Sequence, residues 1–160
     1  MFKKILIAVI LSACALSPGC AASNSGANDI FCPVSVQDLS ADSDIVDTAK
    51  RHDIDYRELI LRCLGREREA MHLLFWVSTE AAGLDGAASQ SHAIFVGLVL
   101  QGVGDAFFAE CLACQGTEVQ EAVRYDLLYA AGFDDGTEEK VLSELRRSYP
   151  RCFPETFNPL

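Results

Sequence analysis

The sequence predicts an all-α fold, either a compact helical bundle or short stacked αα-hairpins, with about six helices. Three observations support this prediction. Apolar residues recur at the helical spacing of three and four, capping residues stand where such segments begin, and glycines stand where they end. A chain of 160 residues is long enough for one domain with a core and short for two.

The clearest predicted helix begins at residue 56. Its apolar residues fall on one face, at Tyr56, Leu59, Ile60, Cys63 and Leu64. Asp55 is placed to cap its first turn, Glu58 follows three residues later, and Gly65 ends it. We expect this segment to be an amphipathic helix whose apolar face lies on the core.

Two further segments are apolar on every side. One covers residues 67–82 around the run from Leu73 to Val77, and it stops at a glycine. The other covers residues 89–103 around the run from Ala93 to Leu100, and it also ends at glycines. A helix that is apolar all round belongs in the interior, so both segments are predicted as central helices.

Three further helices complete the predicted fold. Residues 105–116 form the first, which an aspartate opens. The second covers residues 117–132 and begins with Thr117 and Gln120 in a capping-box pattern. The third covers residues 137–149, with a proline directly after it.

A short repeat bears on how these helices are arranged. Gly116-Thr117-Glu118 returns as Gly136-Thr137-Glu138 at a spacing of twenty residues, between helices joined by short turns. This pattern resembles the stacked αα-hairpins of HEAT-like proteins, which implies a stacked architecture. Short connections also favour antiparallel neighbours in a compact bundle, so both architectures stay open.

The first 22 residues have the three parts of an export signal. Two lysines precede the apolar run from Ile5 to Leu16, and Pro18-Gly19 and small residues follow it. The apolar run is too short to remain as a membrane span. We therefore expect an exported protein.

Two routes of signal processing remain open. Leu11-Ser12-Ala13-Cys14 resembles the lipobox of bacterial lipoproteins, which implies that Cys14 carries the lipid. Cys20 is a second candidate for lipidation. The other route is cleavage by signal peptidase after Ala21 or Ala22. Either route predicts a protein of the bacterial periplasm, lipid-anchored or soluble.

The remaining chain divides into three predicted segments. Residues 23–41 are expected to be a tether and an irregular N-terminal segment, because they begin with a run of Ala, Ser, Gly and Asn. Residues 42–150 are expected to form a single all-α domain, and residues 151–160 a C-terminal tail.

The chain beyond the signal is strongly acidic. Without Lys3 and Lys4 it carries 11 basic against 23 acidic residues, a formal charge of −12. Such a charge disfavours nucleic acid and anionic membrane surfaces, where binding requires that phosphates be neutralised. It suits either solubility or a basic protein partner, with membrane contact limited to an N-terminal lipid.

Five cysteines lie beyond the signal: Cys32, Cys63, Cys111, Cys114 and Cys152. In a compartment that permits disulfides we expect two bridges and one free thiol, with the connectivity open. Cys111 and Cys114 form a C-x-x-C near a predicted helix C-terminus, where the helix dipole disfavours a thiolate. A structural role is therefore expected for this pair.

Neither a catalytic motif nor a cofactor or metal motif stands out, so no cofactor is expected and catalysis is disfavoured. We expect the protein to bind another protein. Its profile resembles that of small, acidic, helical immunity or inhibitor proteins of the periplasm. Candidate contact residues cluster in an acidic turn and the helix start after it: Asp134, Asp135, Glu138 and Glu139.

Two alternatives stay open. One is a periplasmic hydrolase or metal-dependent enzyme on a helical bundle, for which His72 in Glu69-x-x-His72 and the C-x-x-C are the available groups. The other is a structural component of an envelope assembly.

Overall fold

The computed structural model describes residues 30–31, 35–37, 43–79, 83–132 and 137–157. In these residues the chain is all-α, without a strand. The helices are α1 (Ser43–Lys50), α2 (Tyr56–Leu64), α3 (Arg68–Val77), α4 (Gly86–Val103), α5 (Asp105–Ala113), α6 (Thr117–Ala130) and α7 (Glu138–Ser148). The predicted fold class is therefore confirmed.

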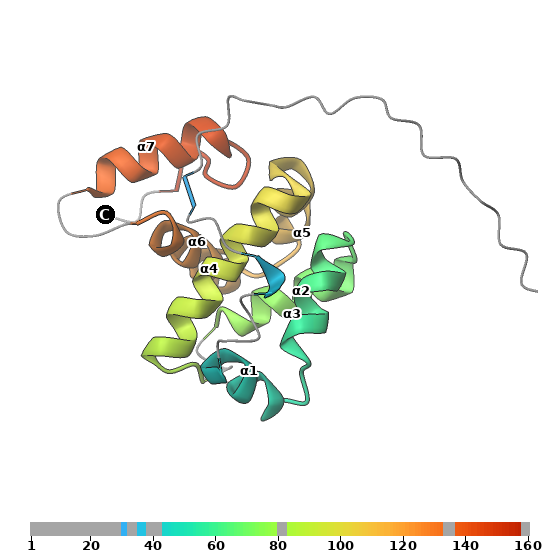
Figure 1. The fold of residues 1–160 in the computed structure, drawn as a ribbon. Helices are drawn as coiled ribbons and strands as arrows, with labels where there is room; N and C mark the ends of the chain where they lie inside the picture. Colours follow the sequence, from blue (N-terminus) through green and yellow to red (C-terminus); the bar gives the residue numbers. More distant parts are fainter. Residues whose placement is uncertain (1–29, 32–34, 38–42, 80–82, 133–136, 158–160) are drawn as a thin grey trace, which may run out of the picture.

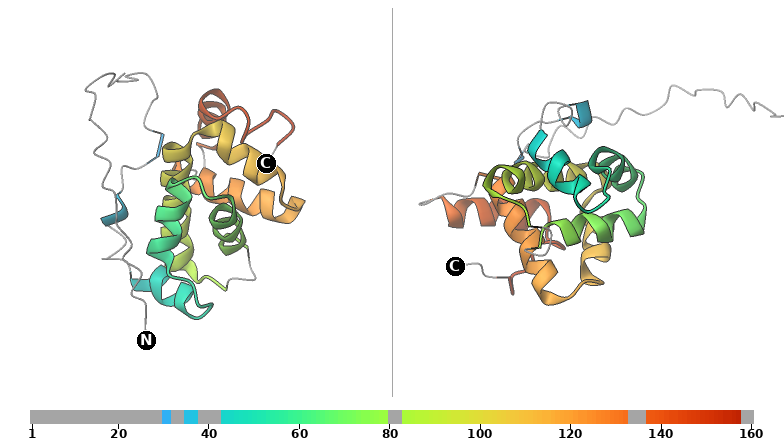
Figure 2. Two further views of the ribbon diagram at one scale, coloured as in Figure 1. Left: turned by 90° about the vertical axis from the view of Figure 1, so that its right-hand side faces the viewer. Right: turned by 90° about the horizontal axis from the view of Figure 1, so that it is seen from below.

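Helix α4 is the centre of the fold. It packs against α1, α2 and α5, and most extensively against α6 (Figures 1 and 2). Helix α3 packs on α2, α5 and α6, while α7 lies at the periphery against α6. Stacked hairpins contact only their neighbours along the stack, whereas α4 reaches four other helices. The arrangement is a compact bundle.

The interior is filled mainly by aromatic and branched apolar side chains. The two central helices expected from the sequence contribute Phe75 from α3 and Val96 and Leu100 from α4, all fully buried. The ring of Phe75 meets that of Phe108 edge to face, with centroids 4.9 Å apart. This geometry is the favoured one for aromatic pairs, and it joins α3 to α5 in the core.

Helix boundaries follow the capping residues in part. The Asp55 carboxylate accepts from the backbone N–H of Glu58 at 3.1 Å, as the sequence predicts for α2. The same bond from Ala88 to Asp85 lets α4 begin at residue 86, three residues earlier than expected. Helix α1 was not predicted, because its eight residues contain few apolar positions beyond the buried Ile45 and Ala49.

The capping box predicted for α6 is wrong. Gly116 is the residue before the helix, Thr117 is already helical, and no side chain caps this end. The amide of Gln120 instead donates to the carbonyl oxygen of Gln115 at 2.9 Å. The glycine adopts the extended conformation that the cap position requires, so the helix starts one residue earlier than the motif implied.

The segment after α7 belongs to the body of the domain. Cys152 and Phe153 are buried, contrary to the expectation of a tail from residue 151. The Asp105 carboxylate accepts from the backbone N–H groups of Arg151 and Cys152, each at 3.0 Å. Arg146 adds a bond to the carbonyl oxygen of Phe157 at 2.6 Å. These polar contacts hold the segment against the body.

The expected disulfide framework is not present in the described part of the chain. Cys63, Cys111, Cys114 and Cys152 are all free thiols. Cys111 is buried, whereas Cys114 is exposed and donates back to the carbonyl oxygen of Glu110. The spacing of three in the C-x-x-C thus places the two thiols in different surroundings. Cys32, Cys14 and Cys20 lie outside the described residues, as does the whole of the predicted export signal.

One further property concerns membranes. Among the described helices, none is by itself long and apolar enough to cross a bilayer. Helices α4 and α5 together have the length and the apolar composition of a span, but their axes are bent by 118° where they join.

Candidate functional site

A buried polar cluster is centred on His92 of α4. This imidazole has no exposed surface, and with Thr48 it is one of two polar side chains buried among the described residues. The Tyr56 hydroxyl lies 2.7 Å from its Nδ1, and the Ser78 hydroxyl lies 3.0 Å from its Nε2. Oδ2 of Asp126 lies 3.6 Å from the same Nε2. Side chains from three other parts of the chain therefore converge on one imidazole.

Local structure places each member of this cluster. Tyr56 is the first residue of α2, fixed by the cap at Asp55. Ser78 follows the last residue of α3, and Asp126 lies within α6, which packs along α4. A buried imidazole needs hydrogen-bond partners at both ring nitrogens, and the two hydroxyls supply them.

Burial shifts the two ionisable groups in opposite directions. It lowers the pKa of His92 to about 3, so the imidazole is neutral at ordinary pH. It raises the pKa of the Asp126 carboxyl to about 7, although a hydrogen bond with Ser78 favours the charged form. The contact between them is therefore not an ion pair near neutral pH. Oδ2 of Asp126 is buried and has no hydrogen-bond partner.

The cluster holds Ser, His and Asp, but it is not arranged as a hydrolytic triad. In a triad the carboxylate orients one ring nitrogen and the serine uses the other. Here Ser78 and Asp126 face the same Nε2, and Tyr56 occupies Nδ1. The imidazole is also fully buried, so a substrate has no access to it. We infer a structural role for His92 itself.

Asp126 connects this cluster to the surface. Its side chain is 14% exposed, and it lines a pocket of about 280 Å³ between α4 and α6. The remaining lining residues are Ser89 and Gln90 from α4 and Tyr125, Leu128 and Tyr129 from α6. The pocket thus has one carboxyl group at the end of a buried polar network and an aromatic border.

The two tyrosines of this border are prominent on the surface. Tyr125 is 49% exposed and Tyr129 is 47% exposed, and they lie one turn apart on α6. Leu61 on α2, at 47%, is the third large apolar side chain exposed in the described residues. Phe157 packs edge to face against Tyr125, with centroids 6.3 Å apart, which restrains that ring.

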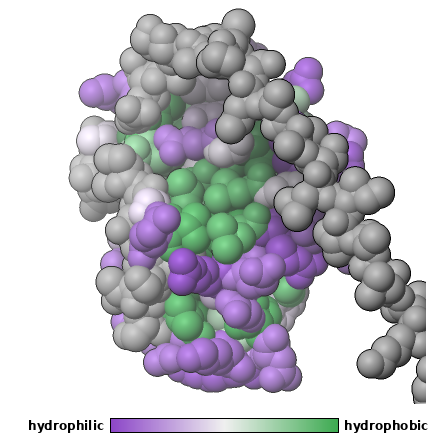
Figure 3. Space-filling model, turned by 45° about the vertical axis from the view of Figure 1, so that its right-hand side comes forward, coloured by the Kyte–Doolittle hydropathy of each residue, from purple (hydrophilic) through white to green (hydrophobic). Residues whose placement is uncertain are grey.

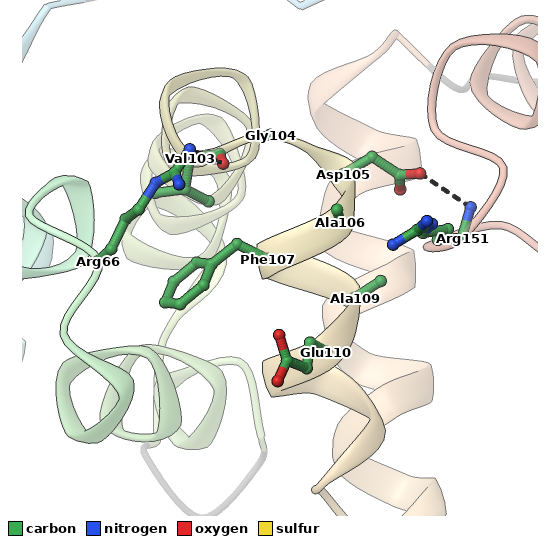
Figure 4. Close-up of a pocket in the computed structure, with 9 residues that line it drawn as sticks. All are labelled: Arg66, Val103, Gly104, Asp105, Ala106, Phe107, Ala109, Glu110 and Arg151. Atoms are coloured by element: carbon green, nitrogen blue, oxygen red, sulfur yellow. Dashed lines mark hydrogen bonds between the residues drawn. The ribbon is translucent and has the colours of Figure 1, made fainter.

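A larger hollow of about 780 Å³ runs along α5 (Figure 4). Phe107 extends into it, with the guanidinium groups of Arg66 and Arg68 at 5.7 and 5.5 Å from its ring centroid. Arg66 also donates to the carbonyl oxygen of Val103 at 2.9 Å, which caps the end of α4. Glu110 pairs with Arg68 at 2.7 Å. Most of the charged groups that line this hollow thus make contacts within the fold.

The structure describes only some of the candidate site residues that were predicted from the sequence. Asp134 and Asp135 lie outside the described residues, Glu138 is the first residue of α7, and Glu139 is exposed on its first turn. His72 is exposed on α3. In the described chain, no three His, Cys, Asp or Glu side chains are grouped so that they could hold a metal ion.

Sequence reasoning missed the site on α4 and α6. One signal was available in the run Tyr125-Asp126-Leu127-Leu128-Tyr129, where two tyrosines at helical spacing stand on either side of a carboxylate. A second was His92, a polar residue at the start of an apolar stretch. Neither pattern indicates burial without knowledge of which helices pack together.

Comparison with known proteins gives no further constraint. No protein family, curated protein or solved structure matches this chain at a significant level. The function is therefore argued from the residues of the site.

Proposed function

We propose that this protein is an exported binding protein whose all-α domain contacts a protein partner through one surface of α4 and α6. We call this the α6 tyrosine surface and define it by Ser89, Gln90, Tyr125, Asp126 and Tyr129. The observation that carries the proposal is the pair of half-exposed tyrosines bordering a pocket with a carboxyl group. Tyrosine is enriched among the residues that dominate protein interfaces, because it combines a large apolar area with a polar end.

The size of the pocket favours a protein partner over a metabolite. Pockets for small organic ligands usually have volumes of about 300–1,000 Å³ and enclose most of the ligand. The pocket at Asp126, at about 280 Å³, is at the small end of that range. It suits a single side chain, with Tyr125 and Tyr129 providing contact area around it.

The sequence supports the setting of this proposal. The N-terminal signal favours export to the periplasm, either as a lipoprotein modified at Cys14 or Cys20 or as a soluble protein. The charge of −12 beyond the signal favours a basic partner over nucleic acid or an anionic surface. An immunity or inhibitor protein, which neutralises a secreted effector, fits this combination.

Partner capture with matched variants tests the proposal. The tagged protein is exposed to envelope and secreted fractions of its source at moderate salt, as wild type, Tyr129→Ala and Leu61→Ala. Leu61 is the matched control because it is equally exposed but lies on α2. We expect one protein to be retained by wild type and Leu61→Ala and lost by Tyr129→Ala. Equal retention by all three would rule out the α6 tyrosine surface as the contact.

A further inference from the structure

We propose that the pocket between α4 and α6 receives an arginine side chain of the protein partner, with Asp126 as its counter-ion. This inference rests on the proposed function, because it names the group through which the partner is recognised. It concerns the pocket itself, so it can be tested without the partner.

The position of Asp126 is the first argument. Its carboxyl group lies at the boundary between the buried cluster and the pocket, with 14% of the side chain exposed. In the described part of the chain, the group at ion-pair distance from it is His92, which burial keeps neutral. A buried carboxylate without a cation is costly, so an incoming positive charge gains more here than at an exposed carboxylate.

The surroundings of Asp126 are polar on the inner side and aromatic on the outer side. From the other elements, Ser78 after α3 and His92 of α4 form the inner side, and Tyr56 of α2 bonds the opposite nitrogen of that imidazole. On α6 itself, Arg124 donates to the carbonyl oxygen of Cys152 at 2.9 Å. That bond holds the Arg124 guanidinium against the C-terminal segment.

The aromatic border favours a guanidinium over an ammonium group. A guanidinium is planar and weakly hydrated, stacks on aromatic rings, and can bond a carboxylate with two parallel N–H groups. The chain uses the same contact within its own fold, where the Arg124 guanidinium lies 5.2 Å from the ring centroid of Phe157. Because Phe157 also restrains Tyr125, one face of the pocket is ordered before the arginine binds.

Binding of a guanidinium should release a proton in mildly acidic solution. A cation beside Asp126 stabilises the carboxylate and lowers its pKa from about 7. Affinity should therefore rise with pH, by up to about tenfold per pH unit below pH 7, and level off above it.

Titration with a pair of small probes tests this inference. N-acetyl-arginine methylamide and the neutral isostere N-acetyl-citrulline methylamide are added to the purified protein and followed by NMR chemical shifts. We expect the arginine probe to bind with an affinity of about 1 mM, and the citrulline probe at least about tenfold more weakly. Asp126→Asn and Tyr129→Ala should each weaken binding of the arginine probe, and Leu61→Ala should not.

Three outcomes would overturn the inference: no binding of the arginine probe, equal binding of both probes, or arginine binding that is unchanged in both Asp126→Asn and Tyr129→Ala. Tyr129→Ala keeps the test decisive if Asp126→Asn does not fold, because Tyr129 is exposed. Failure of the arginine probe, with partner capture still dependent on Tyr129, would reject the arginine pocket and leave the proposed function standing. Binding of the arginine probe without a Tyr129-dependent partner would support the pocket and reject the proposed function.

Discussion

Nε2 of His92 and Oδ2 of Asp126 lie 3.6 Å apart in the interior, and burial moves their pKa values in opposite directions. The pKa of His92 falls from 6.5 to about 3, and that of Asp126 rises from 3.8 to about 7. The folded protein therefore favours the neutral form of both groups. This arrangement has a measurable effect on the pH dependence of stability.

The two groups should make opposing contributions to the free energy of unfolding. Between pH 3 and 6.5 the unfolded chain binds a proton at His92 that the folded protein does not, so stability rises with pH. Between pH 3.8 and 7 the folded protein holds a proton at Asp126 that the unfolded chain has lost, so stability falls with pH. Each slope is about 1.4 kcal/mol per pH unit, and the two offset each other where the windows overlap.

Asp126→Asn should expose the contribution of His92. Relative to wild type, this variant should gain about 2–3 kcal/mol of stability between pH 4.5 and pH 6.5, because only the rising contribution remains. Urea unfolding at the two pH values measures the difference. His92→Gln should show the opposite trend. Parallel pH profiles for wild type and both variants would contradict the assigned pKa shifts.

Tyr56→Phe should destabilise the fold by about 1–3 kcal/mol. The substitution keeps the ring but removes the hydroxyl at 2.7 Å from Nδ1 of His92, which leaves a buried polar atom unsatisfied. Tyr129→Phe is the control, because its hydroxyl is at the surface, and its effect should stay within about 0.5 kcal/mol. Chemical unfolding measures the stability of both variants. Equal effects would show that the Tyr56–His92 hydrogen bond does not stabilise the fold.

Asp105→Ala should release the C-terminal segment. The carboxylate accepts two backbone N–H bonds, from Arg151 and Cys152, and their loss should cost about 1–3 kcal/mol. Hydrogen exchange of residues 151–157 should accelerate in this variant. Glu110→Ala removes an exposed ion pair with Arg68 and should change stability by about 0–1 kcal/mol. Unchanged exchange at 151–157 in Asp105→Ala would show that apolar packing alone holds the segment.

The cysteines should differ sharply in reactivity. Cys114 is exposed, whereas Cys63 is buried and burial raises the pKa of its thiol to about 12. Burial also raises the pKa of Cys111 and Cys152. With iodoacetamide under native conditions, Cys114 should react at least about tenfold faster than these three. Peptide mass spectrometry resolves each site. Comparable labelling of Cys63 in the folded protein would argue against its burial.

Local signals predicted the helices better than their ends. The apolar stripe of α2 and its cap at Asp55 agree with the structure, because both depend on residues within one or two turns. The capping box at Thr117 failed, since the glycine before it satisfied the requirement of the cap position. Helix α1 was missed because it is short, and its stability comes from packing Ile45 into the interior.

The candidate site could not be predicted because it depends on long-range packing. Tyr56, Ser78, His92 and Asp126 meet through contacts between elements far apart in the sequence. The pocket at Asp126 likewise requires that α4 and α6 lie side by side. Composition and charge led us to expect a binding protein, but they carried no information on which face would make the contact. One view of the surface (Figure 3) shows hydrophobic side chains gathered between hydrophilic ones. The sequence alone did not predict where on the surface such a patch would lie.

Site-specific photo-crosslinking in the source cells tests the central claim most directly. A photoreactive residue is placed at Gln90, which is exposed at the edge of the pocket, and at Leu61 on α2 as the control. The α6 tyrosine surface predicts a single crosslinked protein from position 90, its loss on addition of Tyr129→Ala, and none from position 61. The same crosslink from both positions, or crosslinking at position 61 alone, would contradict the claim that this surface binds the partner.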